Sequence, residues 1–130
     1  MAQDAGTQAS KLLIVDDSKV SRMRIRAFFS AHCPSWQVQE AATGDEAIAM
    51  SREFQPDFVT MDVNMPGISG FEAAPQIIGT NPQVRVVMLT ANIQESSKQL
   101  AASMNLSFVA KPATEASLQQ ALDYMLAGTP

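Results

Sequence analysis

The sequence is poor in the residues that build disulfides and cysteine or histidine metal sites. It has one cysteine, Cys33, and one histidine, His32, in 130 residues. A single thiol excludes an internal disulfide framework and a zinc site built from several cysteines. We therefore expect Cys33 to be a small buried apolar residue. We do not expect His32, which has no second histidine beside it, to bind a metal.

Long apolar runs and an excess of basic residues are also absent. No apolar segment approaches the roughly 20 residues that a membrane-spanning helix needs. Nine basic and thirteen acidic residues give a formal net charge of -4, which argues against nucleic-acid binding because that requires a basic surface. Residues 1–10 are small and polar and do not form a signal peptide, so we expect a disordered tail and a cytoplasmic protein.

The sequence does contain enough apolar residues, 46%, for one packed core. Its length suits one domain, which we expect over residues 11–127, with a short tail at 128–130. The predicted strands are 11–15, 35–40, 58–62, 84–89 and 106–110. The predicted helices begin after Ser18, after Thr43, near Ser69, at about Asn92 (ending near Met104) and after Thr114. This alternation predicts an α/β fold with a parallel five-stranded sheet.

Cap and turn residues indicate where several helices begin. Ser18 suits the N-cap position of the first helix, and Thr43 with Glu46 three residues later predicts a capping box. Pro75 falls inside the helix that begins near Ser69 and must remove one helical hydrogen bond. We therefore expect a kink there, or a short and irregular helix.

The first predicted helix carries apolar and basic residues together. The apolar residues at helical spacing are Val20, Met23, Ala27, Phe28 and Ala31. The basic residues are Lys19, Arg22, Arg24 and Arg26. The basic cluster is consistent with a solvated face and equally with a docking surface, and both interpretations stay open.

Polar residues follow the ends of four predicted strands. Asp16 and Asp17 follow the first strand, Asp62 ends the third, Thr90 follows the fourth and Lys111 the fifth. In an open parallel sheet the carboxyl ends of the strands share one edge, where ligands bind. Asp62 alone could equally cap the turn after its strand. The four positions together predict a site at this edge.

Carboxylates that converge in this way repel one another, by about 4 kcal/mol per pair at 4 Å and an effective dielectric constant of 20. Lys111 is one counter-charge, and Mg²⁺ suits a site with few carboxylates, a carbonyl and several waters. The hydroxyl of Thr90 and the ammonium of Lys111 suit phosphoryl oxygens. A metal, a nucleophilic carboxylate, a hydroxyl and an ammonium together indicate phosphoryl transfer.

These motifs, in this order, resemble the receiver domains of two-component response regulators. The matching motifs are Asp16-Asp17, Asp62 with Asn64-Met65-Pro66-Gly67, Thr90-Ala91 and Lys111-Pro112. The resemblance spans residues 11–126 and implies a flavodoxin-like (βα)5 three-layer sandwich. It also implies the strand order 2-1-3-4-5, which is the known order of that fold and does not follow from the residue pattern of this chain.

The resemblance also implies roles. Asp62 would accept a phosphoryl group from a phosphohistidine of a histidine kinase or a histidine phosphotransfer protein. Asp17, Asp62 and the backbone carbonyl of Asn64 would hold Mg²⁺, and Asp16 would support the metal largely through water. A haloacid-dehalogenase-type phosphatase needs a second Asp where this chain has Asn64, and a flavodoxin has no acidic pair in its phosphate loop. Both alternatives are therefore disfavoured.

The remaining roles concern the response to phosphorylation. Thr90 and Lys111 would bind phosphoryl oxygens, and Phe108 occupies a switch position where relatives often have Tyr. A plain core aromatic is the other interpretation of Phe108. The Lys111–Pro112 peptide is cis in the family. Ser69, where relatives often have Asp, and Pro75 depart from the family pattern away from the site.

The expected function is a phosphorylation-activated switch. It would catalyse only its own phosphoryl transfer and dephosphorylation, and would not be an enzyme acting on external substrates. We expect a monomer that signals by binding a separate protein on the face formed by the fourth helix, fifth strand and fifth helix. A receiver-like interaction module that works without phosphorylation is the alternative.

Overall fold

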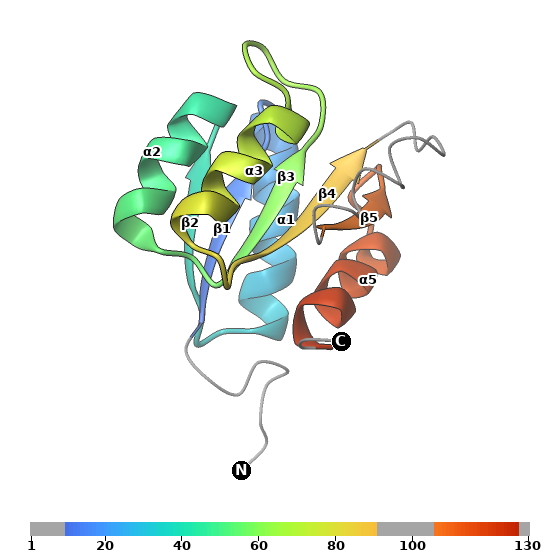
Figure 1. The fold of residues 1–130 in the computed structure, drawn as a ribbon. Helices are drawn as coiled ribbons and strands as arrows, with labels where there is room; N and C mark the ends of the chain where they lie inside the picture. Colours follow the sequence, from blue (N-terminus) through green and yellow to red (C-terminus); the bar gives the residue numbers. More distant parts are fainter. Residues whose placement is uncertain (1–9, 91–105, 128–130) are drawn as a thin grey trace.

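The chain forms one parallel sheet with helices on both faces (Figure 1). The computed structural model describes residues 10–90 and 106–127. The strands are β1 (Lys11–Val15), β2 (Gln37–Ala41), β3 (Phe58–Asp62), β4 (Arg85–Thr90) and β5 (Leu106–Ala110). The helices are α1 (Lys19–His32), α2 (Gly44–Phe54), α3 (Gly70–Thr80) and α5 (Glu115–Leu126). The strand order β2-β1-β3-β4-β5 confirms the predicted fold. The predicted helix at 92–104 and, apart from Ser10, both predicted tails lie outside the described residues.

The sheet separates two apolar clusters, one under each pair of helices. In Figure 1, α2 and α3 lie in front of the sheet, and α1 and α5 lie behind it. Strand β1 serves both clusters, because Leu13 and Val15 point to the α2–α3 side and Leu12 and Ile14 to the α1–α5 side. A strand buried on both faces is apolar at successive positions, and this explains the aliphatic run that predicted β1.

Two strands begin later than predicted. Strand β2 begins at Gln37, and Trp36 belongs to the turn before it, where the backbone N–H of Trp36 donates to the carbonyl of Cys33 at 3.0 Å. The Trp36 ring stacks on Phe29 and Phe58 with centroid distances of 5.9 and 5.0 Å. The position of Trp36 is therefore explained by aromatic packing. Its alternation with Val38, which predicted a strand, does not explain it. Strand β4 begins and ends one residue later than predicted, so Thr90 is the last residue of the strand and does not follow it.

The apolar face predicted for α1 is largely wrong. The helix buries Ile25, Phe28 and Phe29, whereas the side chains of Val20 and Met23 leave the residues 60% and 58% exposed. Two stripes at helical spacing compete on this helix, and the one with the two aromatic rings packs against the sheet because it buries more apolar area. The predicted N-cap is confirmed: Ser18 accepts from the N–H of Ser21 at 3.2 Å. Cys33 is buried as expected.

Helices α2 and α3 differ from the expected end and interior geometry. Thr43 caps α2 as predicted, but Glu46 accepts from the N–H of Ala42 and not from that of Thr43, so the capping box does not close. In α3 the N-cap is Ser69, and the helix is short but continuous through Pro75. Pro75 lies on the exposed side, where water can bind the carbonyl that lacks its helical donor.

Gly70 places the start of α3 directly against the end of β3. Its N–H donates to the carbonyl of Val63 at 2.9 Å. A Cβ at Gly70 would lie 2.5 Å from the carbonyl oxygen of Asp62 and 2.8 Å from the Met88 methyl group. Only glycine permits this approach, so any side chain at this position would push α3 away from the Asp62 backbone.

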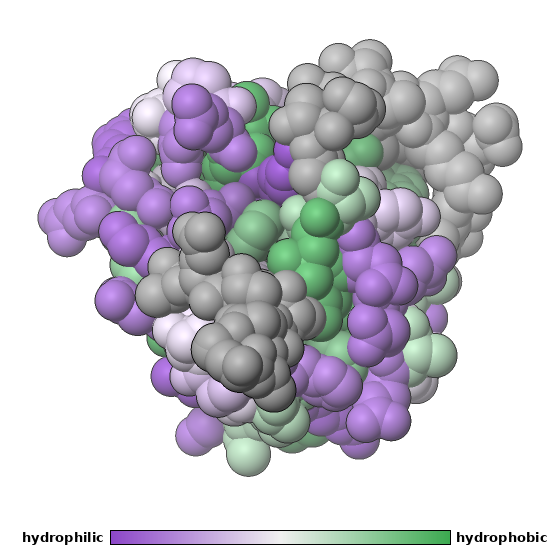
Figure 2. Space-filling view, turned by 90° about the horizontal axis from the view of Figure 1, so that it is seen from below, coloured by the Kyte–Doolittle hydropathy of each residue, from purple (hydrophilic) through white to green (hydrophobic). Residues whose placement is uncertain are grey.

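The outer surface is mainly polar. Viewed from the end where the strands begin, the described surface is largely hydrophilic, with a hydrophobic band between polar regions (Figure 2). Among the described residues no helix is both long enough and apolar enough to span a membrane. Over the whole described surface, the large apolar residues that remain exposed are Val20, Met23, Tyr124 and Leu126.

Candidate functional site

The predicted site residues lie at the carboxyl edge of the sheet. Asp62 is the last residue of β3 and Thr90 the last of β4, while Asp16 follows β1 and Lys111 follows β5. This is the edge toward which the arrowheads of β3 and β4 point in Figure 1. The backbone N–H of Lys111 donates to the carbonyl of Thr90 at 2.8 Å, so the ends of β4 and β5 are held together.

Three carboxylates meet at this edge. One oxygen each from Asp16, Asp17 and Asp62 lie within 4.8 Å of one another. Asp16 is completely buried and Asp62 is 5% exposed, whereas Asp17 is exposed. Asp16 accepts from the N–H of Ser18 at 2.9 Å and from the hydroxyl of Ser21 at 2.7 Å. These hydrogen bonds hold a buried carboxylate at the centre of the cluster.

Lys111 provides the positive charge in the cluster. Its Nζ lies 3.1 Å from Oδ2 of Asp16 and 3.5 Å from Oδ2 of Asp62. Burial by itself lowers the pKa of Lys111, but its hydrogen bond with Asp16 and the charges of Asp16 and Asp62 outweigh burial and raise it. Lys111 is therefore an ammonium shared by two carboxylates.

Burial of Asp62 raises the pKa of its carboxyl to about 6. Lys111 opposes this shift, the charge of Asp16 adds to it, and the N–H of Asn64, which donates to Oδ1 at 3.3 Å, also opposes it. Asp62 is thus mostly ionised above pH 7, in a site that penalises its charge. Such a carboxylate gains from a cation or from a reaction that redistributes its charge.

This pKa predicts how stability depends on pH. The pKa of Asp62 is higher in the folded chain, about 6, than the ordinary 3.8, so its contribution to stability is greatest at low pH and is lost as the pH rises through 6. In metal-free buffer, Asp62→Asn should therefore be more stable than the wild type at pH 7.5, and this gap should shrink toward pH 5. Denaturant unfolding of both proteins at several pH values measures the gap. A stability difference between the two proteins that does not change with pH would contradict the raised pKa of Asp62.

The cluster is suited to Mg²⁺. The ion prefers oxygen ligands, usually takes one or two carboxylates and keeps several waters. Asp17 is exposed, so water can reach the cluster, and Asp16 and Asp62 supply further oxygens from the buried side. Asn64 lies two residues after Asp62 in the loop that follows β3, and the ligand role of its carbonyl stays a prediction.

Phe108 lies on β5 beside Met88 of β4. It is half-buried, and its ring centroid is 5.7 Å from that of Phe71 on α3. The ring packs against the α2–α3 cluster, so its roles as switch residue and as core aromatic both stay predictions. The Lys111–Pro112 peptide is cis, as the resemblance implied.

The structure adds residues that the sequence interpretation missed. The hydroxyl of Ser21 and the guanidinium of Arg22 both reach Asp16, one at its carboxylate and one at its backbone carbonyl. The sequence could have indicated both residues, because they lie in the first turn of the helix that follows β1. Side chains in the first turn of a helix can reach back to the end of the preceding strand. Gly70 was missed because its sequence context does not reveal its close contact with Asp62.

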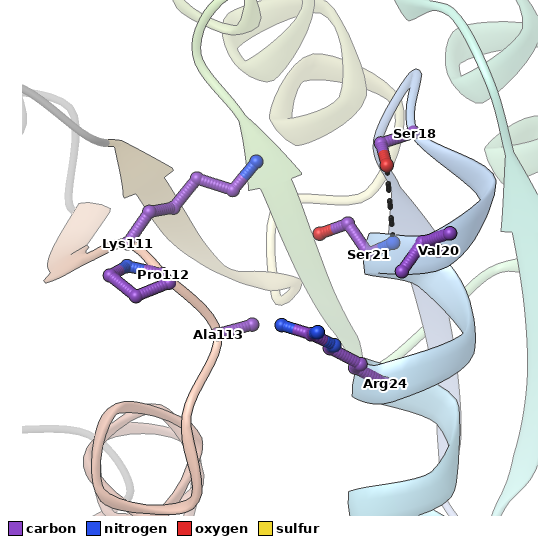
Figure 3. A pocket seen from close by; sticks show the side chains of 7 residues that line it. All are labelled: Ser18, Val20, Ser21, Arg24, Lys111, Pro112 and Ala113. Carbon is purple, nitrogen blue, oxygen red and sulfur yellow. Dashed lines mark hydrogen bonds between the residues drawn. The ribbon is translucent and has the colours of Figure 1, made fainter.

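A hollow of about 400 Å³ adjoins the cluster (Figure 3). It lies between the start of α1 and the residues that follow β5. Its lining residues are Ser18, Val20, Ser21, Arg24, Lys111, Pro112 and Ala113. Lys111 therefore borders both the carboxylates and the hollow, which opens the site to the surface beside α1.

Comparison with known proteins agrees with this geometry. The profile of the response regulator receiver domain family matches residues 12–123. Protein PilH of Pseudomonas aeruginosa is 31% identical over 122 residues, which are 92% of this chain and 99% of PilH. The response regulator protein VraR of Staphylococcus aureus is 40% identical over 85 residues, which are 65% of this chain but only 41% of VraR.

Solved structures give the same result. The response regulator domain of Thermotoga maritima CheB superposes with a TM-score of 0.80 at 26% identity, over 95% of this chain and 100% of that one. A chain of the CheX–CheY–BeF3–Mg²⁺ complex from Borrelia burgdorferi superposes with a TM-score of 0.83 at 25% identity, over 93% of this chain and 92% of that one. From its fold, its carboxylate cluster and these matches, the chain belongs to the response regulator receiver domains of two-component signalling.

Proposed function

We propose that Asp62 accepts a phosphoryl group from the phosphohistidine of a histidine kinase or a histidine phosphotransfer protein. The observation that carries this proposal is the meeting of the Asp62 carboxylate with two further carboxylates and the Lys111 ammonium at one sheet edge. Asp62 is ionised at neutral pH and therefore nucleophilic. Its neighbours supply binding groups for both a metal and a phosphoryl group.

In the transfer, an Oδ of Asp62 attacks the phosphorus of the phosphohistidine. The new O–P bond forms as the P–N bond breaks, and the electron pair of that bond returns to the imidazole nitrogen. Lys111 lies 3.5 Å from Asp62 and donates to the oxygens of the arriving group. Thr90 at the end of β4 offers its hydroxyl to the same group.

Mg²⁺, when bound, would neutralise charge on the carboxylates and on the phosphoryl oxygens. Asp17, Asp62 and the backbone carbonyl of Asn64 would hold it, with Asp16 behind them. The later loss of the phosphoryl group to water would use the same residues. All of these events would take place in the cytoplasm.

The direct test is incubation of the chain with Mg²⁺ and a small acyl phosphate or phosphoramidate. Intact-protein mass spectrometry should show one added phosphoryl group, which is lost in base because it is an acyl phosphate. No added group under conditions that label another receiver domain would overturn the proposal, and would favour an interaction module that works without phosphorylation.

The phosphodonor protein would dock beside the start of α1. A donor histidine must bring its phosphorus to Asp62, so the donor must cover the surface next to Lys111. The hollow lies there, and Val20 lines it (Figure 3). Met23 is also exposed and lies three residues after Val20, on the same side of the helix. Exposed apolar residues at such a position favour contact with an apolar surface of a partner.

Substitution of Met23 tests this docking surface. Met23→Glu should slow phosphotransfer from a phosphorylated histidine phosphotransfer protein that labels the wild type, by about tenfold, because it places a charge in an apolar contact. Labelling by the small phosphodonor should not change, since Met23 is not in the cluster. Tyr124→Glu on α5, also a substitution of an exposed apolar residue, is the control. Equal slowing by both variants, or none by Met23→Glu, would contradict the docking site.

Phosphorylation would act as a switch. It replaces one carboxylate charge by a group of about −1.5 to −2 charges with strong acceptor oxygens. Thr90 and Lys111 would be drawn to it, and Phe108 would repack where it now contacts Phe71. A separate downstream protein would then bind the face that includes β5 and α5. The net charge of -4 favours a protein over a nucleic acid as this partner.

A further inference from the structure

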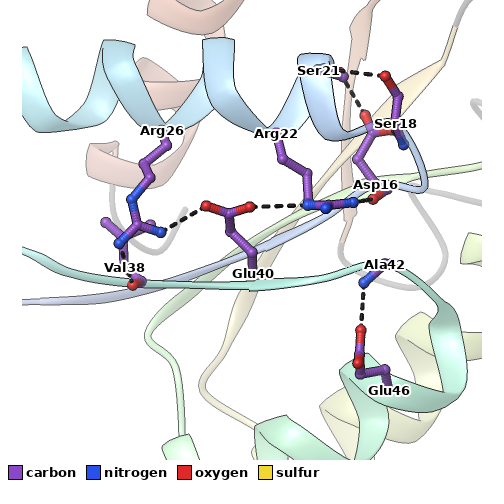
Figure 4. Close-up of polar contacts among 9 residues, drawn as sticks. All are labelled: Asp16, Ser18, Ser21, Arg22, Arg26, Val38, Glu40, Ala42 and Glu46. Atoms are coloured by element: carbon purple, nitrogen blue, oxygen red, sulfur yellow. Dashed lines mark hydrogen bonds and ion pairs between the residues drawn. The ribbon is translucent and has the colours of Figure 1, made fainter.

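Arg22 joins the carboxylate cluster to the neighbouring strand. Its Nη1 donates to the backbone carbonyl of Asp16 at 2.8 Å, and its Nε donates to Oε1 of Glu40 at 2.9 Å (Figure 4). Its side chain is only 16% exposed. One planar guanidinium thus holds two groups at once, which a single ammonium cannot do in the same geometry.

The carbonyl that Arg22 holds has a special position. It belongs to the peptide that joins Asp16 to Asp17, the buried and the exposed carboxylate of the cluster. A rotation of this peptide would turn the Asp17 side chain away from Asp16 and Asp62. On the other side of Asp16, its N–H donates to the carbonyl of Ala41 on β2 at 3.1 Å, so the backbone is held before and after Asp16.

Glu40 keeps Arg22 in place and neutralises it. Glu40 lies on β2 beside Ile14, two residues before Asp16, and its carboxyl bridges Arg22 and Arg26. Burial alone raises the pKa of Glu40, but its hydrogen bonds with Arg22 and Arg26 outweigh burial, and the net pKa is lowered. Glu40 therefore stays ionised, and Arg22 does not present an unpaired cation to a site that would bind a divalent cation.

We propose that Arg22, held by Glu40, is a positioning residue that orients the Asp16–Asp17 peptide and so sets the affinity of the carboxylate cluster for Mg²⁺. This proposal rests on the Mg²⁺ site of the proposed function. Residues behind a metal's direct ligands orient those ligands, and their loss typically weakens metal binding by about 10–100-fold.

Arg26 provides a matched control. It lies one turn further along α1 and pairs with the other oxygen of Glu40 at 2.8 Å. It also donates to the carbonyl of Val38, but no contact between Arg26 and Asp16 is found among the described residues. Arg22→Gln and Arg26→Gln each remove one ion pair with Glu40, and only Arg22→Gln also frees the Asp16 carbonyl.

The experiment measures Mg²⁺ affinity by isothermal titration calorimetry, at a temperature where every variant is folded by circular dichroism. Arg22→Gln should weaken Mg²⁺ binding about tenfold. The Mg²⁺ affinity of Arg26→Gln should stay within about twofold of that of the wild type. This should hold even if Arg26→Gln lowers the thermal midpoint as much as Arg22→Gln does. If Arg22→Gln binds Mg²⁺ as tightly as Arg26→Gln, the positioning role is wrong.

A second measurement needs no metal. The backbone nitrogen of Asp17 is covalently linked to the carbonyl carbon of Asp16, whose oxygen accepts from Arg22. The chemical shift of this nitrogen in metal-free protein therefore reports the hydrogen bond between Arg22 and the Asp16 carbonyl. It should move in Arg22→Gln and in Arg22→Lys, which keeps the charge but not the planar fork, and should stay in Arg26→Gln. An unchanged Asp17 shift in both Arg22 variants would also overturn the proposal.

The two hypotheses fail in different ways. If the wild type does not bind Mg²⁺, or binds it no better than Asp17→Asn does, the proposed metal site fails first. If the wild type binds Mg²⁺ and Asp17→Asn weakens it, while Arg22→Gln has no effect, only the positioning role fails.

Discussion

Asp62→Asn should abolish phosphorylation of the chain. The amide keeps the size and position of the carboxyl group at the end of β3, but it has no nucleophilic carboxylate with which to form an acyl phosphate. After incubation with Mg²⁺ and a small phosphodonor, the wild type should gain one phosphoryl group by mass spectrometry. The variant should gain none within detection, a loss of at least about 100-fold in labelling rate.

Asp57→Asn is the matched control for this result. Asp57 is an exposed carboxylate that immediately precedes β3, at the opposite end of the strand, where it accepts from the backbone N–H of Lys11. The Asp57→Asn variant should be phosphorylated at the same rate as the wild type. Labelling of Asp62→Asn at the wild-type rate would place the acceptor on another residue and would refute the proposed chemistry. Circular dichroism of Asp62→Asn in the labelling buffer tests whether unfolding causes the lost labelling, and the raised pKa of Asp62 predicts that this variant stays folded.

Residues at the ends of buried strands were the most predictable part of the molecule. The runs that lead to Asp16 and end at Asp62 are short, buried at four successive positions and followed by polar or turn residues. These features arise from burial on both faces of a parallel sheet, which is why a shared edge could be expected. The convergence of Asp16, Asp17 and Asp62 followed from that edge.

The face that a helix buries was less predictable. On α1 the sequence offers two apolar stripes, and only tertiary packing decides that Phe28 and Phe29 face the sheet while Val20 and Met23 do not. The turn at Trp36 shows the same limit, since its ring stacks against residues distant in the chain. Periodicity gives the repeat of a helix or strand but not the contacts that choose among its faces.

Contacts that support the site from a helix or from a neighbouring strand could not be predicted. Arg22 reaches Glu40 across 18 positions in sequence, and Gly70 fits only because the Asp62 carbonyl lies under it. These contacts depend on how far apart α1, β2, β3 and α3 lie in space. Residue type and local spacing carry no information on such distances, so the residues that support the site were found only in the structure.

Lys111→Met should destabilise the metal-free chain strongly. Methionine keeps much of the apolar stem of lysine but removes the ammonium that lies 3.1 Å from Asp16 and 3.5 Å from Asp62. Asp16 is completely buried and would keep only its hydrogen bonds from Ser18 and Ser21. Removing one partner of a buried ion pair costs about 3–5 kcal/mol. Because Lys111 is 20% exposed and Asp16 keeps two donors, we expect about 3 kcal/mol.

Saturating Mg²⁺ should recover part of this loss, because a divalent cation replaces the missing positive charge and stabilises the folded chain by mass action. Urea unfolding at pH 7.5, with chelator and then with Mg²⁺, measures both effects. Lys19→Met, on the exposed first turn of α1, should be close to the wild type in both buffers. Mg²⁺ should therefore stabilise Lys111→Met more than it stabilises the wild type or Lys19→Met. Equal stabilisation of all three proteins would mean that Lys111 and the metal do not share the Asp16–Asp62 charge, and the site would need a different electrostatic account.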